Sequence, residues 1–208
     1  MYPVIKRCID IVGVGLGLIV LSPVLAVVAV AIWWDMGRPI FFKHQRPGYK
    51  DKPFNMLKFR TMRQPNEDEN MYLTDAERVT RLGNFLRNYS LDELPELFNV
   101  LKGDMSLVGP RPLLMEYLEI YTDEQARRHD VKPGITGWAQ VNGRQNITFS
   151  KRFEYDVWYV DNMSFILDIK ILFLTIIKVF KRDGVDTGQS FNEVDDVGIL
   201  IAASKGDD

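Results

Sequence analysis

The chain has 208 residues, of which 46% are hydrophobic and 26% are charged, and its formal net charge is −2. A chain of this length can bury one substantial core and holds two domains at most. A net charge this close to zero excludes a nucleic-acid-binding protein by composition, and the single cysteine, Cys8, excludes an intrachain disulfide. One thiol is typical of a reducing compartment.

The charge is distributed unevenly along the sequence. Residues 1–63 contain ten Lys or Arg and three Asp or Glu, whereas residues 183–208 contain one Lys and seven acidic residues. A basic front part next to a hydrophobic segment favours anionic partners, either lipid head groups or anionic substrates. The acidic end, residues 185–208, carries few signals of order and is predicted to be a flexible tail.

Residues 11–34 form an uncharged run of 24 residues. As a helix with a rise of about 1.5 Å per residue, the run would reach roughly 36 Å, which is enough to cross a bilayer. A plain transmembrane helix is therefore one interpretation. A signal peptide is disfavoured because the run is too long, although Ala29-Val30-Ala31 imitates a cleavage site.

Two features favour a re-entrant topology instead. Pro23 follows Ser22 at the centre of the run, where a proline removes a backbone hydrogen bond and bends a helix. Both flanks are basic, with Lys6 and Arg7 before the run and Arg38, Lys43 and Arg46 after it. Spanning helices usually show a one-sided excess. We therefore predict a helix that breaks at Ser22-Pro23 and returns to the same face, with the serine hydroxyl bonded to a carbonyl that the proline frees.

Two apolar and aromatic runs in residues 39–62 flank the turn-forming stretch of residues 46–51. This pattern predicts a β-hairpin. Lys58 and Arg60 alternate with Phe59 near the end of the second run, so on a strand both cations point to one side. They either protect a solvated edge or contact phosphate.

The central helix is predicted between residue 90 and a glycine stop at Gly103. Its start is set either by Ser90, with Glu93 completing a capping box, or by Pro95. In both cases Asp92 and Glu93 lie at a helix N-terminus, which favours anions, including phosphates. Further helices are predicted over residues 75–88 and 113–128.

Residues 129–144 are predicted to form a structured loop, in which His129 is interpreted as a packing or hydrogen-bonding residue rather than a catalytic base. Residues 165–182 carry an apolar arc opposite four basic residues. This pattern fits a helix that lies in a membrane interface, and equally a core-facing helix of a soluble domain.

Adjacent carboxylates at a helix start often serve only as a cap, so Asp92 and Glu93 alone do not define a site. The context adds Arg111, which Pro110 and Pro112 hold on a stiff backbone and whose guanidinium can bind a phosphate through two bonds. Four more cations are candidates for the same site: Arg87, Lys58, Arg60 and Arg144. Carboxylates beside many cations form the grouping that binds Mg²⁺ and a diphosphate together.

The segments KFRTM, SLDELPELFNVLKGDMSLVGPRP and RHDVKPGITGWAQVNGR resemble the core of the bacterial sugar transferases. Within that group the chain resembles the small monotopic polyprenyl-phosphate phosphoglycosyl transferases, most closely the short enzyme of the Campylobacter protein N-glycosylation pathway. The resemblance covers about residues 3–184 and is specific, since separated motifs agree in order and spacing.

The resemblance implies that a phosphosugar passes from a UDP-sugar to undecaprenyl phosphate with release of UMP. It implies Asp92 as the nucleophile of a covalent phosphosugar intermediate, Glu93 as the second acid, and Mg²⁺ held at this pair. It places Arg111 and its two prolines beside the phosphates and uridine, and it makes the segment around Ser22-Pro23 re-entrant. Membrane lipids and downstream glycosyltransferases are the other partners that it implies, at the cytoplasmic face of the bacterial inner membrane.

Together these patterns predict an α+β fold, mainly helical with a small β-hairpin, a re-entrant membrane helix and interfacial amphipathic helices. The expected regions are a membrane segment over residues 1–36, a catalytic domain over 37–184 and the tail over 185–208. Two other functions stay open: an Mg²⁺-dependent phosphohydrolase acting on a lipid diphosphate, and a membrane-anchored adaptor without activity. The sequence does not identify the sugar.

Overall fold

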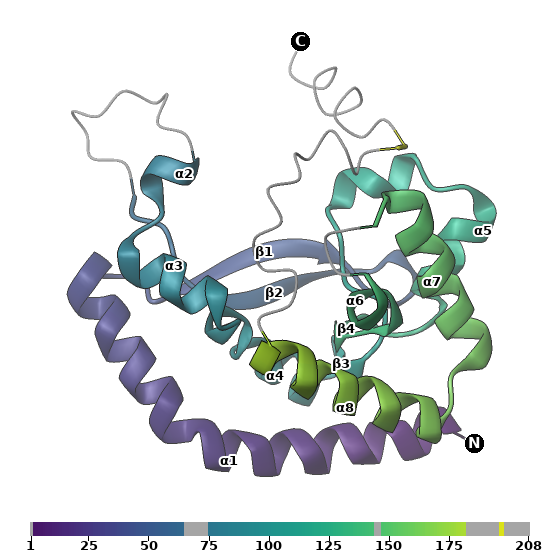
Figure 1. Ribbon diagram of the computed structural model, residues 1–208, viewed down its shortest axis with the longest axis horizontal. Coiled ribbons are helices and arrows are strands. Elements are labelled where there is room, and N and C mark those ends of the chain that lie inside the picture. Colours follow the sequence, from purple (N-terminus) through teal and green to yellow (C-terminus); the bar gives the residue numbers. More distant parts are fainter. Residues whose placement is uncertain (1, 65–74, 144–146, 182–195, 198–208) are drawn as a thin grey trace.

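The computed structural model describes residues 2–64, 75–143, 147–181 and 196–197 (Figure 1). Its helices are α1 (Tyr2–Met36), α2 (Asp75–Arg78), α3 (Arg81–Asn88), α4 (Glu96–Lys102), α5 (Asp123–Ala126), α6 (Trp138–Asn142), α7 (Phe149–Asn162) and α8 (Phe165–Lys181). Its strands are β1 (Phe41–Pro47), β2 (Pro53–Phe59), β3 (Ser106–Val108) and β4 (Gly134–Thr136). Four 3-10 helices connect them: η1 (Tyr49–Asp51), η2 (Leu91–Glu93), η3 (Met115–Glu119) and η4 (Arg127–Asp130). The predicted α+β class, mainly helical with a small hairpin, is confirmed.

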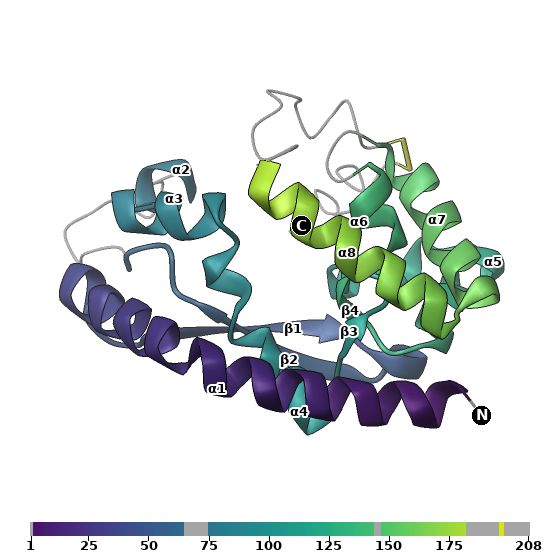
Figure 2. The same cartoon turned by 60° about the horizontal axis from the view of Figure 1, so that its bottom comes forward.

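The long helix α1 bends along one edge of the molecule and contains Pro23 without interruption of the helix (Figures 1 and 2). Pro23 has no N–H to donate to the carbonyl of Ile19, four residues earlier. The Ser22 hydroxyl donates to that carbonyl instead, at 2.8 Å. The serine therefore satisfies the freed carbonyl as predicted, while the helix bends rather than breaks, and the re-entrant topology stays a prediction.

One side of α1 packs on the domain, and the other side exposes its apolar side chains to the outside of the protein. Val14 joins the core cluster of Phe54, Met56, Val100 and Met105. The opposite side exposes large apolar residues, among them Val12, Leu16, Ile19, Val20 and Val27. Within the described residues, α1 is the one helix long and apolar enough to cross a membrane. This exposed apolar face is compatible with association of the chain with a membrane.

Both ends of α1 are fastened to the same domain. At the first end, Arg7 donates to the carbonyls of Val100 and Leu101 on α4, at 2.6 and 2.8 Å. At the other end, the buried Arg60 guanidinium donates to the carbonyls of Met36, Gly37 and Arg38. The exposed apolar face of α1 therefore cannot leave the domain at either end without breaking several hydrogen bonds.

The hairpin forms as predicted. Strands β1 and β2 pair antiparallel, with Phe41 opposite Phe59 and Pro47 opposite Pro53, and η1 occupies the turn. Phe54 and Met56 point from β2 into the core beneath α1 and α4. The hairpin thus forms a platform that carries Lys58 toward the site described below.

The predicted helix over residues 75–88 is divided into α2 and α3. Val79 pairs with Met62 in an isolated bridge, and the Thr80 hydroxyl caps α3 by accepting from the Gly83 N–H at 2.9 Å. This cap fixes the orientation of α3, which brings Arg87 to the site. The polar residues that precede these helices, 65–74, lie outside the described residues.

The predicted capping box at Ser90 is wrong. Ser90 adopts a left-handed conformation with φ 54°, makes no capping bond, and is followed by the single turn η2. The regular helix α4 begins only after Pro95, which agrees with the second of the two predicted starts. Its stop at Gly103, with φ 98°, is confirmed. The consequence is that Glu93 is available for other partners.

Strands β3 and β4 form a second, parallel pair that the sequence did not reveal. A Cβ atom on Gly134 would lie 2.1 Å from the backbone nitrogen of Gly109, so only glycine permits this approach. The Gly134 N–H donates to the Pro110 carbonyl at 2.9 Å. The pair therefore fixes the backbone that enters Arg111.

The predicted helix over residues 113–128 is replaced by η3, α5 and η4. Leu113 and Tyr117 pack in a cluster with Phe149 and Phe153 of α7. Thr122 caps the start of α5 through a capping box with Gln125. The predicted loop after it contains β4 and α6. Long-range aromatic packing overrides the local helical pattern here.

Helix α8 was predicted either to lie in a membrane interface or to face the core of a soluble domain. Leu167 and Ile171 are buried against the domain, whereas Ile166, Ile169, Phe173 and Ile176 are exposed. The apolar arc thus faces outward and favours the interfacial interpretation. Of the predicted tail, only Asp196 and Val197 are described, and Val197 packs on the Phe149 cluster.

Candidate active site

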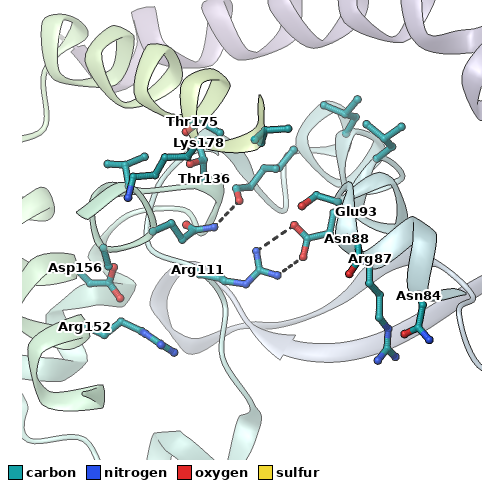
Figure 3. Close-up of a pocket in the computed structure, with 18 residues that line it drawn as sticks. Asn84, Arg87, Asn88, Glu93, Arg111, Thr136, Arg152, Asp156, Thr175 and Lys178 are labelled. Carbon is teal, nitrogen blue, oxygen red and sulfur yellow. Dashed lines mark hydrogen bonds and ion pairs between the residues drawn. The ribbon is translucent and has the colours of Figure 1, made fainter. Parts of the chain in front are cut away.

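A cavity of about 690 Å³ opens between α3, η2, α6, α7 and α8 (Figure 3). Its walls carry charged and amide side chains: Asn84, Arg87, Asn88, Glu93, Arg111, Gln140, Arg152, Asp156 and Lys178. Cations outnumber carboxylates in this set, which favours an anionic occupant. Apolar residues, including Leu94, Leu97 and Val179, complete the lining.

At the centre of the cavity, Arg111 and Glu93 face each other (Figure 3). The two nitrogens of the guanidinium fork donate to the two carboxylate oxygens of Glu93. Lys58 reaches the same carboxylate from β2, with Nζ 2.8 Å from Glu93 Oε1. Its Nζ also lies 3.4 Å from Oε1 of the buried Glu96 on α4. Two cations and two carboxylates thus form one network.

This network separates the pKa values of its two acids. Burial raises the pKa of Glu93, but the charges of Arg111 and Lys58 outweigh burial and lower it to about 2. Burial, followed by the charge of Glu93, raises the pKa of Glu96 to about 7. Glu93 therefore stays ionised at neutral pH, whereas Glu96 titrates close to it.

Asp92 precedes Glu93 on η2, and the cavity is lined by Glu93 rather than by Asp92. Burial and the charge of Glu93 raise the pKa of Asp92, while Lys58 and Arg111 oppose this shift. No other side chain in the described ranges hydrogen-bonds to its carboxylate. Asp92 is therefore the carboxylate of the pair that is not already held by a cation.

A buried ion pair supports Arg111 from behind. Arg128 donates to Oδ2 of Asp156 at 2.7 and 3.1 Å, and both side chains are almost fully buried. The Arg128 guanidinium also donates to the Arg111 carbonyl at 2.7 Å and to the Tyr121 hydroxyl at 2.8 Å. The backbone of Arg111 is thereby fixed on one side by this pair and on the other by β4.

The structure brings most of the predicted site residues together. Glu93, Arg111 and Lys58 form the network, Asp92 adjoins it, and Arg87 lines the cavity while its Nε donates to the Thr61 hydroxyl at 3.0 Å. Pro110 and Pro112 are buried on either side of Arg111.

Other predicted residues lie elsewhere. Arg60 is buried at the end of α1, where its Nη1 and Nη2 atoms donate to backbone carbonyls, and it does not line the cavity, so its contact with phosphate stays a prediction. Ser22 and Pro23 lie within α1. Arg144 lies outside the described residues. His129 donates from Nδ1 to the Asp51 carboxylate and does not line the cavity, in agreement with its interpretation as a packing or hydrogen-bonding residue.

Several lining residues were missed in the sequence. Asn84 and Asn88 lie at helical spacing from Arg87 on α3. Because Arg87 was already a candidate, this spacing could have identified both asparagines. Arg152 and Asp156 share the same spacing on α7, but nothing local distinguished them from a solvated face. Lys178 is one of the four basic residues opposite the apolar arc of residues 165–182, a pattern that fits an interfacial helix and equally a core-facing one.

The donor set suits a magnesium ion only in company with a substrate. Among the described residues, no group of three or more His, Cys, Asp or Glu could hold a metal. Mg²⁺ commonly binds through one or two carboxylates together with substrate phosphates. Asp92 offers hard oxygen ligands, and Glu93 would offer them only by releasing a cation. The residues present therefore fit an ion that arrives with a diphosphate.

This arrangement can hold a multiply charged phosphate substrate beside a carboxylate, next to an apolar helix that suits a membrane. The chain belongs to the bacterial sugar transferase family, whose sequence model matches residues 1–182. It is 52% identical over 182 residues to the uncharacterized sugar transferase EpsL of Bacillus subtilis, covering 88% of this chain and 90% of that protein.

Two larger relatives are named for an activity. The UDP-glucose:undecaprenyl-phosphate glucose-1-phosphate transferase of Escherichia coli is 44% identical, over 85% of this chain and 40% of that protein. The undecaprenyl-phosphate galactose phosphotransferase of Salmonella typhimurium is 40% identical, over 86% of this chain and 41% of that protein. The chain thus spans about two fifths of the length of these two relatives.

Proposed function

We propose that this protein transfers a sugar 1-phosphate from a UDP-sugar to undecaprenyl phosphate and releases UMP. The observation that carries the proposal is the Arg111–Glu93 pair in the wall of a cation-rich cavity, with Lys58 bonded to Glu93 and Asp92 next to Glu93 in the chain. Both substrates are phosphate esters, and a cavity with excess cations lowers the cost of bringing two anions together. The activities for which the two larger relatives are named support the same reaction.

The proposed mechanism has two displacements at one phosphorus atom. First, an Asp92 carboxylate oxygen attacks the β-phosphorus of the UDP-sugar, and the bond from that phosphorus to the bridging oxygen breaks, so that UMP leaves with the electron pair. Next, a phosphate oxygen of the lipid attacks the same phosphorus, and the bond to Asp92 breaks. The carboxylate is thereby restored and a lipid diphosphate sugar is the product.

Within this mechanism, Arg111 and Lys58 stabilise the negative charge that develops on the phosphoryl oxygens. Glu93 keeps both cations in place through its two carboxylate oxygens. Mg²⁺ bound with the diphosphate would be held by Asp92, and by Glu93 after it releases one of its cations, and would supply additional charge neutralisation. The Arg128–Asp156 pair positions Arg111 through its backbone.

The proposed location is the cytoplasmic face of the inner membrane, with α1 entering one leaflet and returning. Both ends of α1 are bound to the same domain, which supports this monotopic arrangement. The exposed apolar face of α8 adds a second contact with the membrane. The acceptor phosphate lies at head-group depth, so a cavity at this level can reach it.

The test uses the full chain in detergent or nanodiscs, a panel of UDP-sugars, and Mg²⁺. With the correct UDP-sugar and no lipid, the protein gains the mass of one phosphosugar and releases one equivalent of UMP. Asp92→Asn forms no adduct and loses transfer, because an amide cannot replace the attacking oxygen. Asp123→Asn, which changes an exposed aspartate on α5, is the matched control. This variant should keep both adduct formation and sugar transfer.

Other outcomes of the same test would support the two alternative functions, a phosphohydrolase or an adaptor. Continued turnover without acceptor would indicate a phosphohydrolase, and no adduct, UMP or transfer with any UDP-sugar would indicate an adaptor. If the wild type transfers sugar without ever forming an adduct, and Asp92→Asn keeps most of its activity, the covalent route is wrong. Glu93→Gln is expected to be impaired and still to form adduct slowly.

A further inference from the structure

Strand β2 is bordered by β1 on one edge and by a side chain of α4 on the other. β1 pairs with β2 over the whole length of both strands. At the opposite edge, Oδ1 of Asn99 accepts from the N–H of Leu57 at 2.9 Å, and Nδ2 of Asn99 donates to the carbonyl of Asn55 at 2.8 Å. Asn99 is buried. One amide therefore satisfies a donor and an acceptor of the strand, as a neighbouring strand would.

The amide is itself held in a fixed place. The main-chain carbonyl of Asn99 accepts from the N–H groups of residues 103–105, at 3.0 to 3.3 Å, and so closes the C-terminal end of α4. The side-chain amide has one allowed orientation, because the Leu57 N–H needs its oxygen and the Asn55 carbonyl needs its nitrogen. Asn99 is therefore a rigid link between α4 and β2.

This link joins the two elements that carry the charged network. Lys58 follows Leu57 on β2, and Glu96 lies three residues before Asn99, on the same side of α4. Nζ of Lys58 lies 2.8 Å from Oε1 of Glu93 and 3.4 Å from Oε1 of Glu96. The place of Lys58 beside the two acids thus depends on the position of β2 along α4.

Apolar packing alone does not define that position. Phe54 and Met56 of β2 share one core cluster with Val100 of α4. Burial of apolar surface is non-directional, so it brings the two elements together and leaves their relative shift open. A slip of one residue along a strand moves the backbone by about 3.3 Å, which is enough to break a hydrogen bond. The directional contacts of Asn99 therefore determine where Lys58 lies.

We propose that Asn99 is a positioning residue of the transfer reaction, which holds Lys58 beside Glu93 through the Leu57 N–H. The inference rests on the proposed function and adds to it the residue that sets the place of Lys58. Asn99 does not belong to the described residues that line the cavity, so it acts through Lys58. Lys58 stabilises charge that develops in the transition state, and its displacement should therefore lower kcat and leave KM almost unchanged.

The test is a double-mutant cycle between Asn99 and Lys58 in the full chain, with the UDP-sugar that forms adduct in the panel above. Asn99→Leu keeps the volume of the side chain and removes both hydrogen bonds. It should lower kcat for UMP release roughly ten-fold or more, since a small displacement of a group at the reacting centre is costly, and change the KM for the UDP-sugar less than about three-fold. In a Lys58→Met background, the same change should lower kcat less than about two-fold, because the group on which Asn99 acts is gone.

A control and a second variant separate positioning from a loss of stability. Asn162→Leu removes an exposed amide of α7 that donates to the Trp158 carbonyl, and it should leave kcat unchanged in both backgrounds. Asn99→Asp keeps the oxygen that accepts from the Leu57 N–H and loses the donor to Asn55, so its kcat should lie between those of wild type and Asn99→Leu. The same cycle is run with this variant. All constants are compared at a temperature at which circular dichroism shows every variant to be folded.

Three outcomes would overturn the inference while leaving the proposed function intact. The first is an equal loss of kcat in Asn99→Leu with and without Lys58, which would indicate a general structural role. The second is a wild-type kcat in folded Asn99→Leu, and the third is a raised KM for the UDP-sugar at unchanged kcat. An absence of adduct and of UMP release in the wild type with every UDP-sugar would contradict the proposed function, and the inference with it.

Discussion

Arg111 donates to both carboxylate oxygens of Glu93 through the two nitrogens of its guanidinium fork. The motif that was expected to meet a phosphate directly is thus oriented first by a carboxylate of the same chain. A guanidinium has five N–H donors, so those not used by Glu93 remain for a substrate. The planar fork is therefore needed twice, once toward Glu93 and once toward the phosphate.

Replacement of Arg111 by lysine tests this double role. Arg111→Lys keeps the charge and loses the fork, and the loss of a contact of about 1.5–3 kcal/mol should lower kcat/KM roughly ten- to over a hundred-fold. The matched control is Arg127→Lys, on the surface, where Arg127 pairs with Glu124 and Asp161. Steady-state kinetics of UMP release measure both. Near-normal kinetics in Arg111→Lys would restrict the residue to a structural role.

The raised pKa of Glu96 predicts a pH-dependent stability. Between its ordinary value of 4.5 and about 7, the folded protein holds a proton that the unfolded chain has lost. Stability attributable to Glu96 therefore falls as pH rises through this window, by at most about 3 kcal/mol. The lowered pKa of Glu93 gives no change there, since its contribution is lost only as pH falls toward about 2.

Glu96→Gln removes this titration. Relative to wild type, the variant should gain thermal stability between about pH 4.5 and about pH 8, as measured by the difference in Tm at each pH. All other groups titrate in both proteins, so their effect cancels in the difference in Tm between the variant and wild type. A constant difference across the window would show that Glu96 is not protonated in the folded protein.

The buried Arg128–Asp156 pair predicts a strongly coupled stability effect. Arg128→Met leaves the Asp156 carboxylate buried without its partner and should destabilise the protein by about 3–5 kcal/mol. The double variant Arg128→Met/Asp156→Leu should recover much of that loss, because neither charge remains. Urea unfolding of both, with the exposed Arg127→Met as control, measures the coupling. Additive losses in the double variant would contradict it.

The topology of α1 is testable in cells. In a Cys8→Ser background, Val4→Cys and Lys43→Cys place thiols at exposed positions near the two ends of α1. Both should resist a membrane-impermeant thiol reagent in intact spheroplasts and react after permeabilisation. Labelling of Val4→Cys alone would demonstrate a spanning helix. Pro23→Ala should shift the protein toward that pattern, because a straight helix is long enough to span.

Local signals in the sequence predicted much of the fold. The turn residues between two aromatic runs identified the hairpin, Gly103 identified the end of α4, and Ser22 beside Pro23 identified the hydrogen bond that compensates the proline. Each of these depends on residues close together in the chain. The order of motifs also identified the family.

Contacts between distant residues could not be predicted in this way. Glu93 had a local partner in the capping box of Ser90, but its ion pairs with Lys58 and Arg111 prevailed. Arg60 had the same alternation as Lys58, yet the chain turns after Phe59 and directs Arg60 to the end of α1. Arg152 and Lys178 reach the cavity only because α7 and α8 fold back over it.

The attachment of α1 at both ends has a consequence for how the protein sits in its membrane. Arg7 fixes one end to α4 and Arg60 fixes the other beside β2, so in the proposed monotopic arrangement the depth of α1 in the lipid would also set the height of the cavity above it. In this arrangement α1 would set the distance of the cavity from the membrane surface, in addition to holding the domain at the membrane. An unrelated transmembrane anchor in its place would keep the domain at the membrane, yet leave the cavity free to drift away from the plane of the head groups.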